Sequence, residues 1–200
     1  MDRMINKGMH YFLRLMLLIL AYALTAKIIL NYFTANHVVS IIWPSSGIAL
    51  AALMLGGKKY WPGIFIGAAL GNMLSGASNP IFVTLGIATG NTLEALSAYW
   101  LLIHFCRLNA DWDSPRDYFC LGVVGSLCSI ISAGTGVSAL YLADLMPSDM
   151  FFSAFLRWCQ GDIIGIIIFC PLITLMTMRS ESVMTINLFI NFIFCFDLAF

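Results

Sequence analysis

Long, nearly uninterrupted apolar runs dominate this sequence and decide what it can fold into. A helix needs about 20 mostly apolar residues to cross the hydrocarbon core of a bilayer. The chain is only 10% charged, whereas soluble proteins are about 25% charged. The sequence therefore predicts an all-α, polytopic transmembrane helical bundle with about seven spans. The runs are 11–33, 38–55, 60–74, 81–105, 118–142 and 150–176, and one that begins at 186 and continues to residue 200.

The first run follows a short basic segment, as a secretory signal would. Ala21, Tyr22 and Ala23 have the small-x-small pattern of a cleavage site. However, the apolar run continues beyond them to residue 33 and further spans follow. We therefore expect a retained signal-anchor helix and not a cleaved signal peptide.

Lysine and arginine residues alternate with the runs. They occur before the first run, at 58–59, at 107 and 116, and at 179, whereas the connections 34–37, 75–80 and 143–149 contain none. Because basic residues accumulate in cytoplasmic loops, this pattern predicts a cytoplasmic N-terminal segment, 1–10. The run from 186 would then leave the cytoplasm without a returning helix. We therefore expect the domain, 11–200, to be C-terminally truncated, with an eighth span missing.

Glycines recur at intervals of four within three of the runs. Such ridges let helix backbones approach one another closely. We expect them to pack helices together inside the bundle, and a homodimer formed through an outward-facing ridge is the alternative. The spaced glycines are Gly63, Gly67 and Gly71, then Gly86 and Gly90, then Gly161 and Gly165.

Two Trp-Pro pairs, Trp43-Pro44 and Trp61-Pro62, stand at the start of apolar segments. Tryptophan favours the membrane interface, and proline is tolerated in the first turn of a helix because its missing N–H would have no partner there. Each pair therefore predicts an interface followed by a helix start.

The first pair allows a second interpretation, because apolar residues already precede it. The segment Pro44–Gly47 would then break the second span inside the membrane and leave 48–55 as a short half-helix. Broken helices are tolerated where protein or a wet cavity satisfies their free amides. The alternatives are a polar cavity near Ser45, Ser46 and Gly47, or a plain helix cap.

Ionisable residues within apolar runs cost roughly 2.5–3.5 kcal/mol each at the centre of a bilayer, so each calls for a partner. Asn91 lies three residues before Glu94 and shares its helix face. We expect Lys27 to pair with an acid, and Arg157 to pair with Glu94 or with a carbonyl group. The ionisable residues within the runs are Lys27, Glu94, Arg157, Asp162 and Asp197.

This group of residues has three readings. In the first, the polar groups satisfy one another and only hold helices together. In the second, they form a ligand- or proton-responsive site, with Arg157 as an anion-binding or switch residue. In the third, they form an ion pathway that uses the same charges for transport. Asp162 and Glu94 would be the electrostatic partners of Arg157.

Several function classes have no support in the sequence. Ten basic and ten acidic residues give a formal net charge of zero, which excludes the electrostatic footprint of a nucleic-acid-binding protein. We find no nucleophile and base pair, no phosphate-binding glycine loop and no cluster of metal ligands. The sequence therefore predicts no catalytic residue, no metal and no cofactor within these 200 residues.

One pattern resembles a known family. It consists of WPSSGIALA at 43–51, GGKKYWPGIFIGA at 56–68, Asn91 with Glu94, and Gly161-Asp162 followed by Gly165 and Pro171. These residues resemble the type-one membrane-associated sensor family (MASE), the integral-membrane input domain of bacterial histidine kinases, diguanylate cyclases and cyclic-di-GMP phosphodiesterases. Ser45 stands where the family more often has a second proline.

The resemblance implies a multi-pass sensor of the bacterial inner (plasma) membrane that controls a cytoplasmic output through a small-molecule stimulus. It implies about eight spans followed by the output region, which agrees with the expected truncation. The expected partners are the lipid bilayer, the stimulus, and either a second copy of the chain or another membrane protein. The alternatives are a membrane scaffold for a partner protein and a transporter of small solutes or ions.

Overall fold

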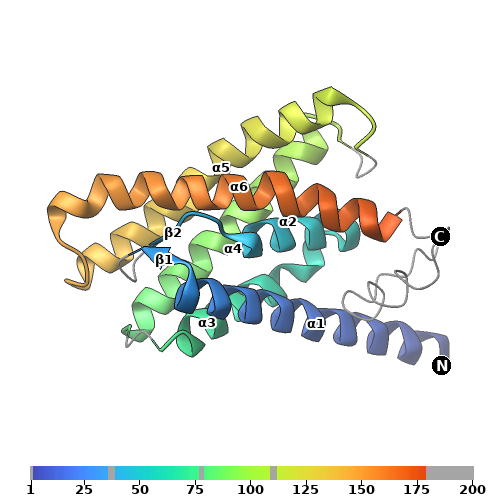
Figure 1. Ribbon diagram of the computed structural model, residues 1–200. Coiled ribbons are helices and arrows are strands. Elements are labelled where there is room, and N and C mark those ends of the chain that lie inside the picture. The colour runs from blue at the N-terminus through green and yellow to red at the C-terminus, as the bar shows by residue number, and fades with distance from the viewer. Residues whose placement is uncertain (1, 36–38, 77–78, 109–111, 179–200) are drawn as a thin grey trace.

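The computed structural model describes residues 2–35, 39–76, 79–108 and 112–178, and shows a bundle of helices with one very short strand pair (Figure 1). The predicted all-α class is confirmed. The run from 186 and Asp197 lie outside the described residues. The elements are α1 (Asp2–Tyr32), β1 (Thr34–Ala35), β2 (Val39–Ser40), α2 (Pro44–Gly56), η1 (Lys58–Tyr60), α3 (Trp61–Leu74), α4 (Ile81–His104), α5 (Pro115–Leu142), η2 (Ser148–Met150) and α6 (Phe151–Met178).

Four of the described helices, α1, α4, α5 and α6, are long and apolar enough to cross a membrane. The described residues therefore support four spans, and the prediction of about seven is not supported. Helix α2 has 13 residues and α3 has 14, and both fall short of the roughly 20 residues that a span requires. Helix α2 is shorter than the apolar run 38–55 because the residues before Pro44 are extended and include β2. A cytoplasmic N-terminus stays a prediction.

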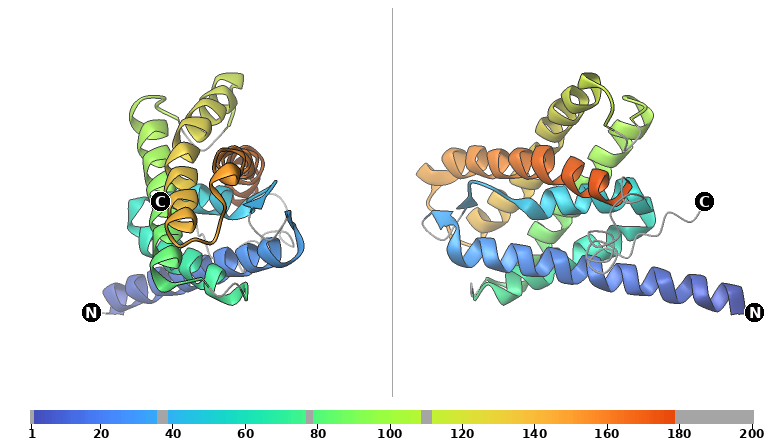
Figure 2. Two further views of the ribbon diagram at one scale, coloured as in Figure 1. Left: turned by 90° about the vertical axis from the view of Figure 1, so that its left-hand side faces the viewer. Right: turned by 45° about the vertical axis from the view of Figure 1, so that its right-hand side comes forward.

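The short helix α2 lies at the centre of the bundle. It packs against α1, α4 and α6, and its residues from Pro44 to Leu53 are all buried. Helix α1 lies below it and α6 above it in Figure 1, and the right-hand view of Figure 2 shows α4 and α5 crossing behind. Since α2 is apolar on nearly every side, it suits a position surrounded by protein.

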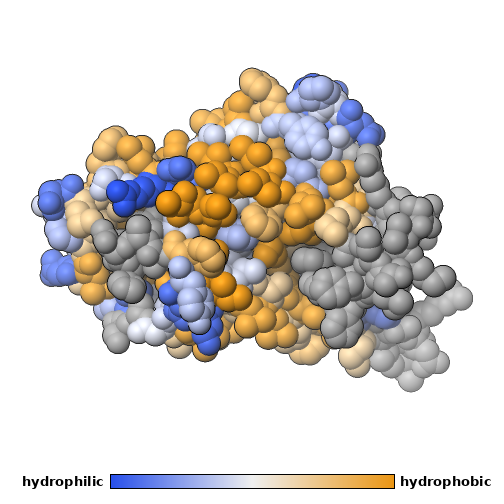
Figure 3. Space-filling model, viewed as in Figure 1, coloured by the Kyte–Doolittle hydropathy of each residue, from blue (hydrophilic) through white to orange (hydrophobic). Residues whose placement is uncertain are grey.

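Large apolar side chains cover the outside of the longer helices. Leu24, Leu93, Leu127 and Ile168 are each between 44% and 57% exposed, and Figure 3 shows apolar residues over most of the visible face. A water-soluble monomer rarely exposes contiguous apolar surface on this scale. This surface and the four apolar helices indicate an integral membrane protein.

The glycine ridge of α3 faces α1. A Cβ atom added at Gly67 would lie 2.8 Å from the Tyr22 Cβ, and one at Gly71 would lie 2.6 Å from the Ala26 Cβ. A Cβ atom at Gly63 would likewise lie against the Leu18 side chain, and one at Gly90 of α4 would lie against the Thr135 side chain of α5. The prediction that these glycines pack helices inside the bundle is confirmed, and the α3 ridge is buried within the chain.

The glycines of α6 serve a different contact. Gly161 and Gly165 lie against the extended backbone that leads into α2, and a Cβ atom at Gly161 would lie 2.7 Å from the Ser40 carbonyl oxygen. The Trp43 N–H donates a hydrogen bond of 3.0 Å to the Gly161 carbonyl oxygen. Extended backbone at membrane depth needs partners of this kind within the protein.

Both Trp-Pro pairs precede or begin helices as predicted. Pro44 is the first residue of α2, directly after Trp43, and Pro62 is the second residue of α3, after a Trp61 that is 47% exposed. For the first pair the structure supports the helix start, and the expected break at Pro44–Gly47 before a half-helix at 48–55 is wrong because these four residues are the first turn of α2. Pro44 begins a helix, and that helix is a short one that starts beside the middle of α6.

Candidate functional site

Six polar side chains from five helices meet in the interior of the bundle, and we call them the polar cluster. None of the six is more than 4% exposed. Buried polar groups at this depth are costly unless they bond to one another. The members are Tyr22 of α1, Ser46 of α2, Asn91 and Glu94 of α4, Ser132 of α5 and Asp162 of α6.

Asp162 is the hub of the cluster. Its Oδ1 accepts a hydrogen bond of 2.7 Å from the Ser46 hydroxyl, and its Oδ2 lies 2.8 Å from the Ser132 hydroxyl oxygen. The Ser46 hydroxyl oxygen also lies 3.4 Å from Glu94 Oε2. One serine hydroxyl thus stands between two carboxyl groups, and α2 connects α4 to α6 through it.

Asn91 extends the cluster to α1 and α5. Its side-chain amide donates to the Tyr22 hydroxyl oxygen at 3.0 Å, and its carbonyl oxygen lies 3.0 Å from the Ser132 hydroxyl oxygen. Ser132 also accepts a hydrogen bond of 2.9 Å from the indole N–H of Trp158. All five helices of the cluster are therefore linked by side-chain hydrogen bonds.

The two serine hydroxyls have fewer hydrogen atoms than the acceptor oxygens around them. The hydroxyls of Ser46 and Ser132 carry one proton each, yet four oxygen atoms of Asn91, Glu94 and Asp162 lie around them. The second oxygen of Glu94, Oε1, is buried and has no hydrogen-bond partner among the described residues. A proton on either carboxyl group, or a small ligand that donates, would complete the bonding.

The sequence places these groups together through helical spacing and small residues. Asn91 and Glu94 are three residues apart and share one face of α4, near the middle of that helix. Gly90 brings α4 close to α5 at the Ser132 carbonyl oxygen. Close approach of backbones is what allows short serine side chains to bridge between helices.

The model of one family covers almost the whole chain. MASE1 matches residues 14–196. The chain belongs to the MASE1 family. MASE1 domains are membrane sensory input domains and are not catalytic. No curated protein and no solved structure matches the chain.

In this MASE1 domain the structure brings together four residues that the sequence singles out. Ser46, Asn91, Glu94 and Asp162 all belong to the polar cluster. Two neighbouring candidates lie outside it. The Ser45 hydroxyl bonds to the Thr25 hydroxyl at 2.9 Å, and Gly47 packs against the backbone of α6 at Gly165 and Cys170.

The predicted charge pairs do not form with the cluster. Arg157 is exposed on α6, whereas Glu94 is buried and bonded to Ser46. The pairing of Arg157 with Glu94 is therefore wrong. Asp162, which lies in the cluster with Glu94, is five residues from Arg157 on the same helix. This spacing directs the two α6 side chains to different faces, so Arg157 points away from the cluster. Lys27 is half-buried in the last turns of α1, and the hydrogen bonds of neither buried carboxyl group reach it.

Pro171 has a local structural place in the MASE1 fold. It lies inside α6 and is buried, nine residues beyond Asp162. Proline removes one backbone hydrogen bond of a helix. The Thr174 hydroxyl lies 3.1 Å from the Pro171 carbonyl oxygen and 2.9 Å from the Cys170 carbonyl oxygen, and so supplies local polar contacts to this turn.

Sequence reasoning missed three residues at the site, Tyr22, Ser132 and Trp158. Attention to ionisable groups alone overlooks neutral side chains that can bond. A signal was present, because hydroxyl groups inside apolar spans tend to face neighbouring helices. Ser132 is nevertheless one of several serines in its run, and only the packing of α4 and α6 against α5 distinguishes it.

Proposed function

We propose that this MASE1 domain is the input module of a bacterial inner-membrane signalling protein, and that its polar cluster registers the stimulus. The output under its control is a cytoplasmic diguanylate cyclase, cyclic-di-GMP phosphodiesterase or histidine kinase. The observation that carries the proposal is the bonding of five helices to one buried cluster in which two serine hydroxyl protons face four acceptor oxygens.

The cluster gives the domain a way to couple a small chemical change to helix positions. Adding or removing one proton or one small ligand changes which of Glu94 and Asp162 the Ser46 hydroxyl can satisfy. Each choice favours a different approach of α2 to α4 and α6. A stimulus that binds one arrangement better than another shifts the population between them.

A change at the polar cluster would reach the residues that follow α6 through that helix itself. Asp162 lies near the middle of α6, which continues past the buried Pro171 to Met178. A rotation or shift of α6 at the cluster would move its far end through the turn at Pro171, where the Thr174 hydroxyl contacts the carbonyl oxygens of Cys170 and Pro171. This is the route by which the cluster would act on an output region.

Asp162→Asn tests the proposal in the full-length protein. The amide keeps the size of the side chain but replaces a carboxylate oxygen by a donor, so the bonding of Ser46 and Ser132 must rearrange. We expect output activity to change by roughly 5-fold or more, as typical coupling free energies of 1–3 kcal/mol imply. The measurement is cyclase, phosphodiesterase or kinase activity in membranes, with membrane insertion checked by fractionation.

Gln160→Ala is the matched control, because Gln160 is exposed on the same helix two residues earlier. It should leave output activity unchanged. If Asp162→Asn inserts normally and signals like the unmodified protein under all stimuli, the polar cluster only holds helices together.

A further inference from the structure

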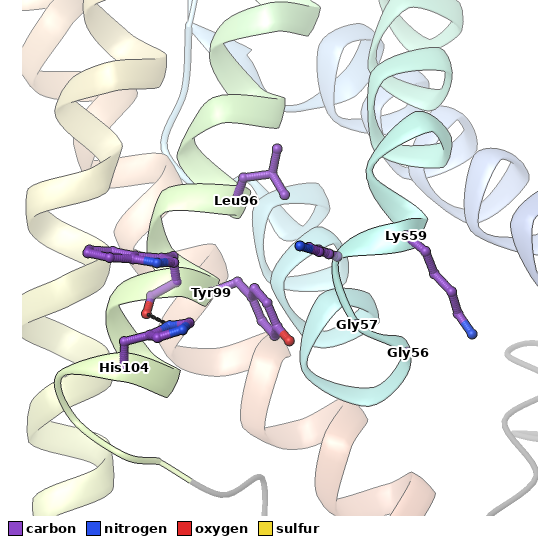
Figure 4. Close-up of a pocket in the computed structure, with 8 residues that line it drawn as sticks. Gly56, Gly57, Lys59, Leu96, Tyr99 and His104 are labelled. Atoms are coloured by element: carbon purple, nitrogen blue, oxygen red, sulfur yellow. Dashed lines mark hydrogen bonds between the residues drawn. The ribbon is translucent and has the colours of Figure 1, made fainter.

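An open pocket lies at the C-terminal end of α4, between the last turns of that helix and the turn that joins α2 to α3. Its volume is about 760 Å³. Figure 4 shows Leu96 and Tyr99 of α4 extending toward Gly57 across the pocket, with His104 beside them. This pocket is separate from the polar cluster, and nothing in the proposed function requires it.

The pocket lies at the level of the membrane interface. His104 is the last residue of α4, one of the helices that can span a bilayer. Trp100, four residues earlier, lines the pocket and is 49% exposed. Tryptophan and tyrosine are enriched where a span meets the lipid headgroups, so Tyr99 and Trp100 place the opening among them.

The chemistry of the wall favours an anion. Lys58 and Lys59 both line the pocket and are exposed, and the lining residues that the structure describes include no acidic side chain. His104 Nδ1 lies 3.0 Å from the Trp100 carbonyl oxygen, which can only accept a hydrogen bond. The hydrogen is therefore on Nδ1, and Nε2 takes no part in that bond.

The same pocket also has an apolar side. The His104 ring stacks on the Trp100 ring, with 5.2 Å between their centroids, and Leu96 lies deeper along α4 toward the hydrocarbon. A cation beside an apolar wall at interface depth suits a molecule with a charged headgroup and apolar chains. Basic pockets between spanning helices bind anionic lipid headgroups in this way.

We propose that this pocket binds the phosphate group of an anionic phospholipid, with Lys58 as its cationic contact. The phosphate lies near the lysine and the histidine ring, and the acyl chains follow the surface of α4 past Leu96. Free phosphate compounds share the headgroup chemistry but have nothing to place against the apolar side.

The neighbouring lysine provides a matched control. Figure 4 shows Lys59 extending away from Tyr99 and His104. Its Nζ lies 5.8 Å and 5.6 Å from the ring centroids of Tyr11 and Tyr60, toward α1. Lys58 and Lys59 have the same charge, both line the pocket and both are exposed. The ammonium group of Lys59 is the one that lies over the two tyrosine rings.

The test compares Lys58→Gln with Lys59→Gln in the purified chain. Binding of phosphatidylglycerol and of phosphatidylcholine is measured by native mass spectrometry and by titration in nanodiscs of mixed composition. We expect preferential binding of phosphatidylglycerol, weakened roughly 5-fold by Lys58→Gln and little changed by Lys59→Gln, as about one surface lysine's contribution implies. Inorganic phosphate and glycerol 3-phosphate at millimolar concentration should not displace the lipid.

Four outcomes would overturn the proposal. Equal binding of both lipids would mean that no anion is recognised, and equal losses in the two variants would mean general surface charge. Displacement by inorganic phosphate or by glycerol 3-phosphate would identify a soluble anion as the ligand. Binding that survives both Lys58→Gln and a second variant, His104→Gln, would place the lipid elsewhere on the chain.

Discussion

Replacing Gly165 with alanine is expected to destabilise the bundle by about 3 kcal/mol, at the upper end of the usual cost of overpacking. The added Cβ atom would collide with the Trp43 carbonyl oxygen, would lie 2.7 Å from the Trp43 carbonyl carbon, and would lie 3.4 Å from the Pro44 nitrogen. All three are backbone atoms, so no side-chain rotation relieves the contact. Thermal unfolding in detergent should show a Tm lower by roughly 10 °C.

Gly134→Ala is the control for this prediction. Gly134 lies in α5, and an added Cβ atom there would meet nothing within 4 Å. Because alanine is the better helix former, this variant should be as stable as the unmodified chain or more stable by up to about 1 kcal/mol. Equal losses in the two variants would contradict the close contact between α6 and the start of α2.

The glycine at 165 illustrates how far the sequence can predict this fold. Spacing of four residues correctly identifies Gly161 and Gly165 as positions of close approach. It does not identify what approaches, because the same spacing suits another helix or an extended segment. Here the neighbour is the extended backbone from Ser40 to Trp43, which the apolar run 38–55 had concealed within an expected helix.

The expected number of spans exceeds the four that the described residues support, for a related reason. Apolar content shows that a segment is buried in lipid or in protein, and it does not show which. Helix α2 is as apolar as a span, but it is surrounded by α1, α4 and α6. Only its length, set by Pro44 at one end and by Gly57 with a φ of 80° at the other, separates it from a helix that crosses the membrane.

For the polar cluster, the sequence identified the residues that must be buried with partners but not the partners themselves. The high cost of an ionisable group in a span correctly selected Glu94 and Asp162. The same reasoning joined Glu94 to Arg157 by charge, whereas the structure joins both acids to Ser46. Charge attraction is therefore a weaker guide here than helix packing, since Arg157 can reach the surface and extend toward the headgroups.

Ser132→Ala is expected to lower stability by about 2–4 kcal/mol, the other large effect. The hydroxyl accepts from the Trp158 indole N–H at 2.9 Å and lies within hydrogen-bond distance of Asn91 and Asp162. Removing it leaves the partly buried Trp158 N–H and one buried acceptor without that partner, which costs about 1–3 kcal/mol for each unsatisfied group. Unfolding of the purified chain in detergent by a denaturant titration measures the loss.

The control is Ser126→Ala, on the same helix. Ser126 is exposed, and among the described residues its hydroxyl bonds only to the Gly122 carbonyl oxygen of its own helix, at 2.7 Å. Its removal should change stability by no more than about 0.5 kcal/mol. Similar losses at the two serines would mean that the hydroxyl of Ser132 has no special place in the bundle.

A double variant separates hydrogen bonding from packing at Ser132. Ser132→Ala and Asp162→Asn alter two ends of one contact, 2.8 Å long, so their effects should not add. We expect the double variant to be more stable than the sum of the single losses predicts, by more than about 0.5 kcal/mol. Strict additivity would show that the two side chains act independently, and the cluster would then lack the coupling between α5 and α6 that a switch requires.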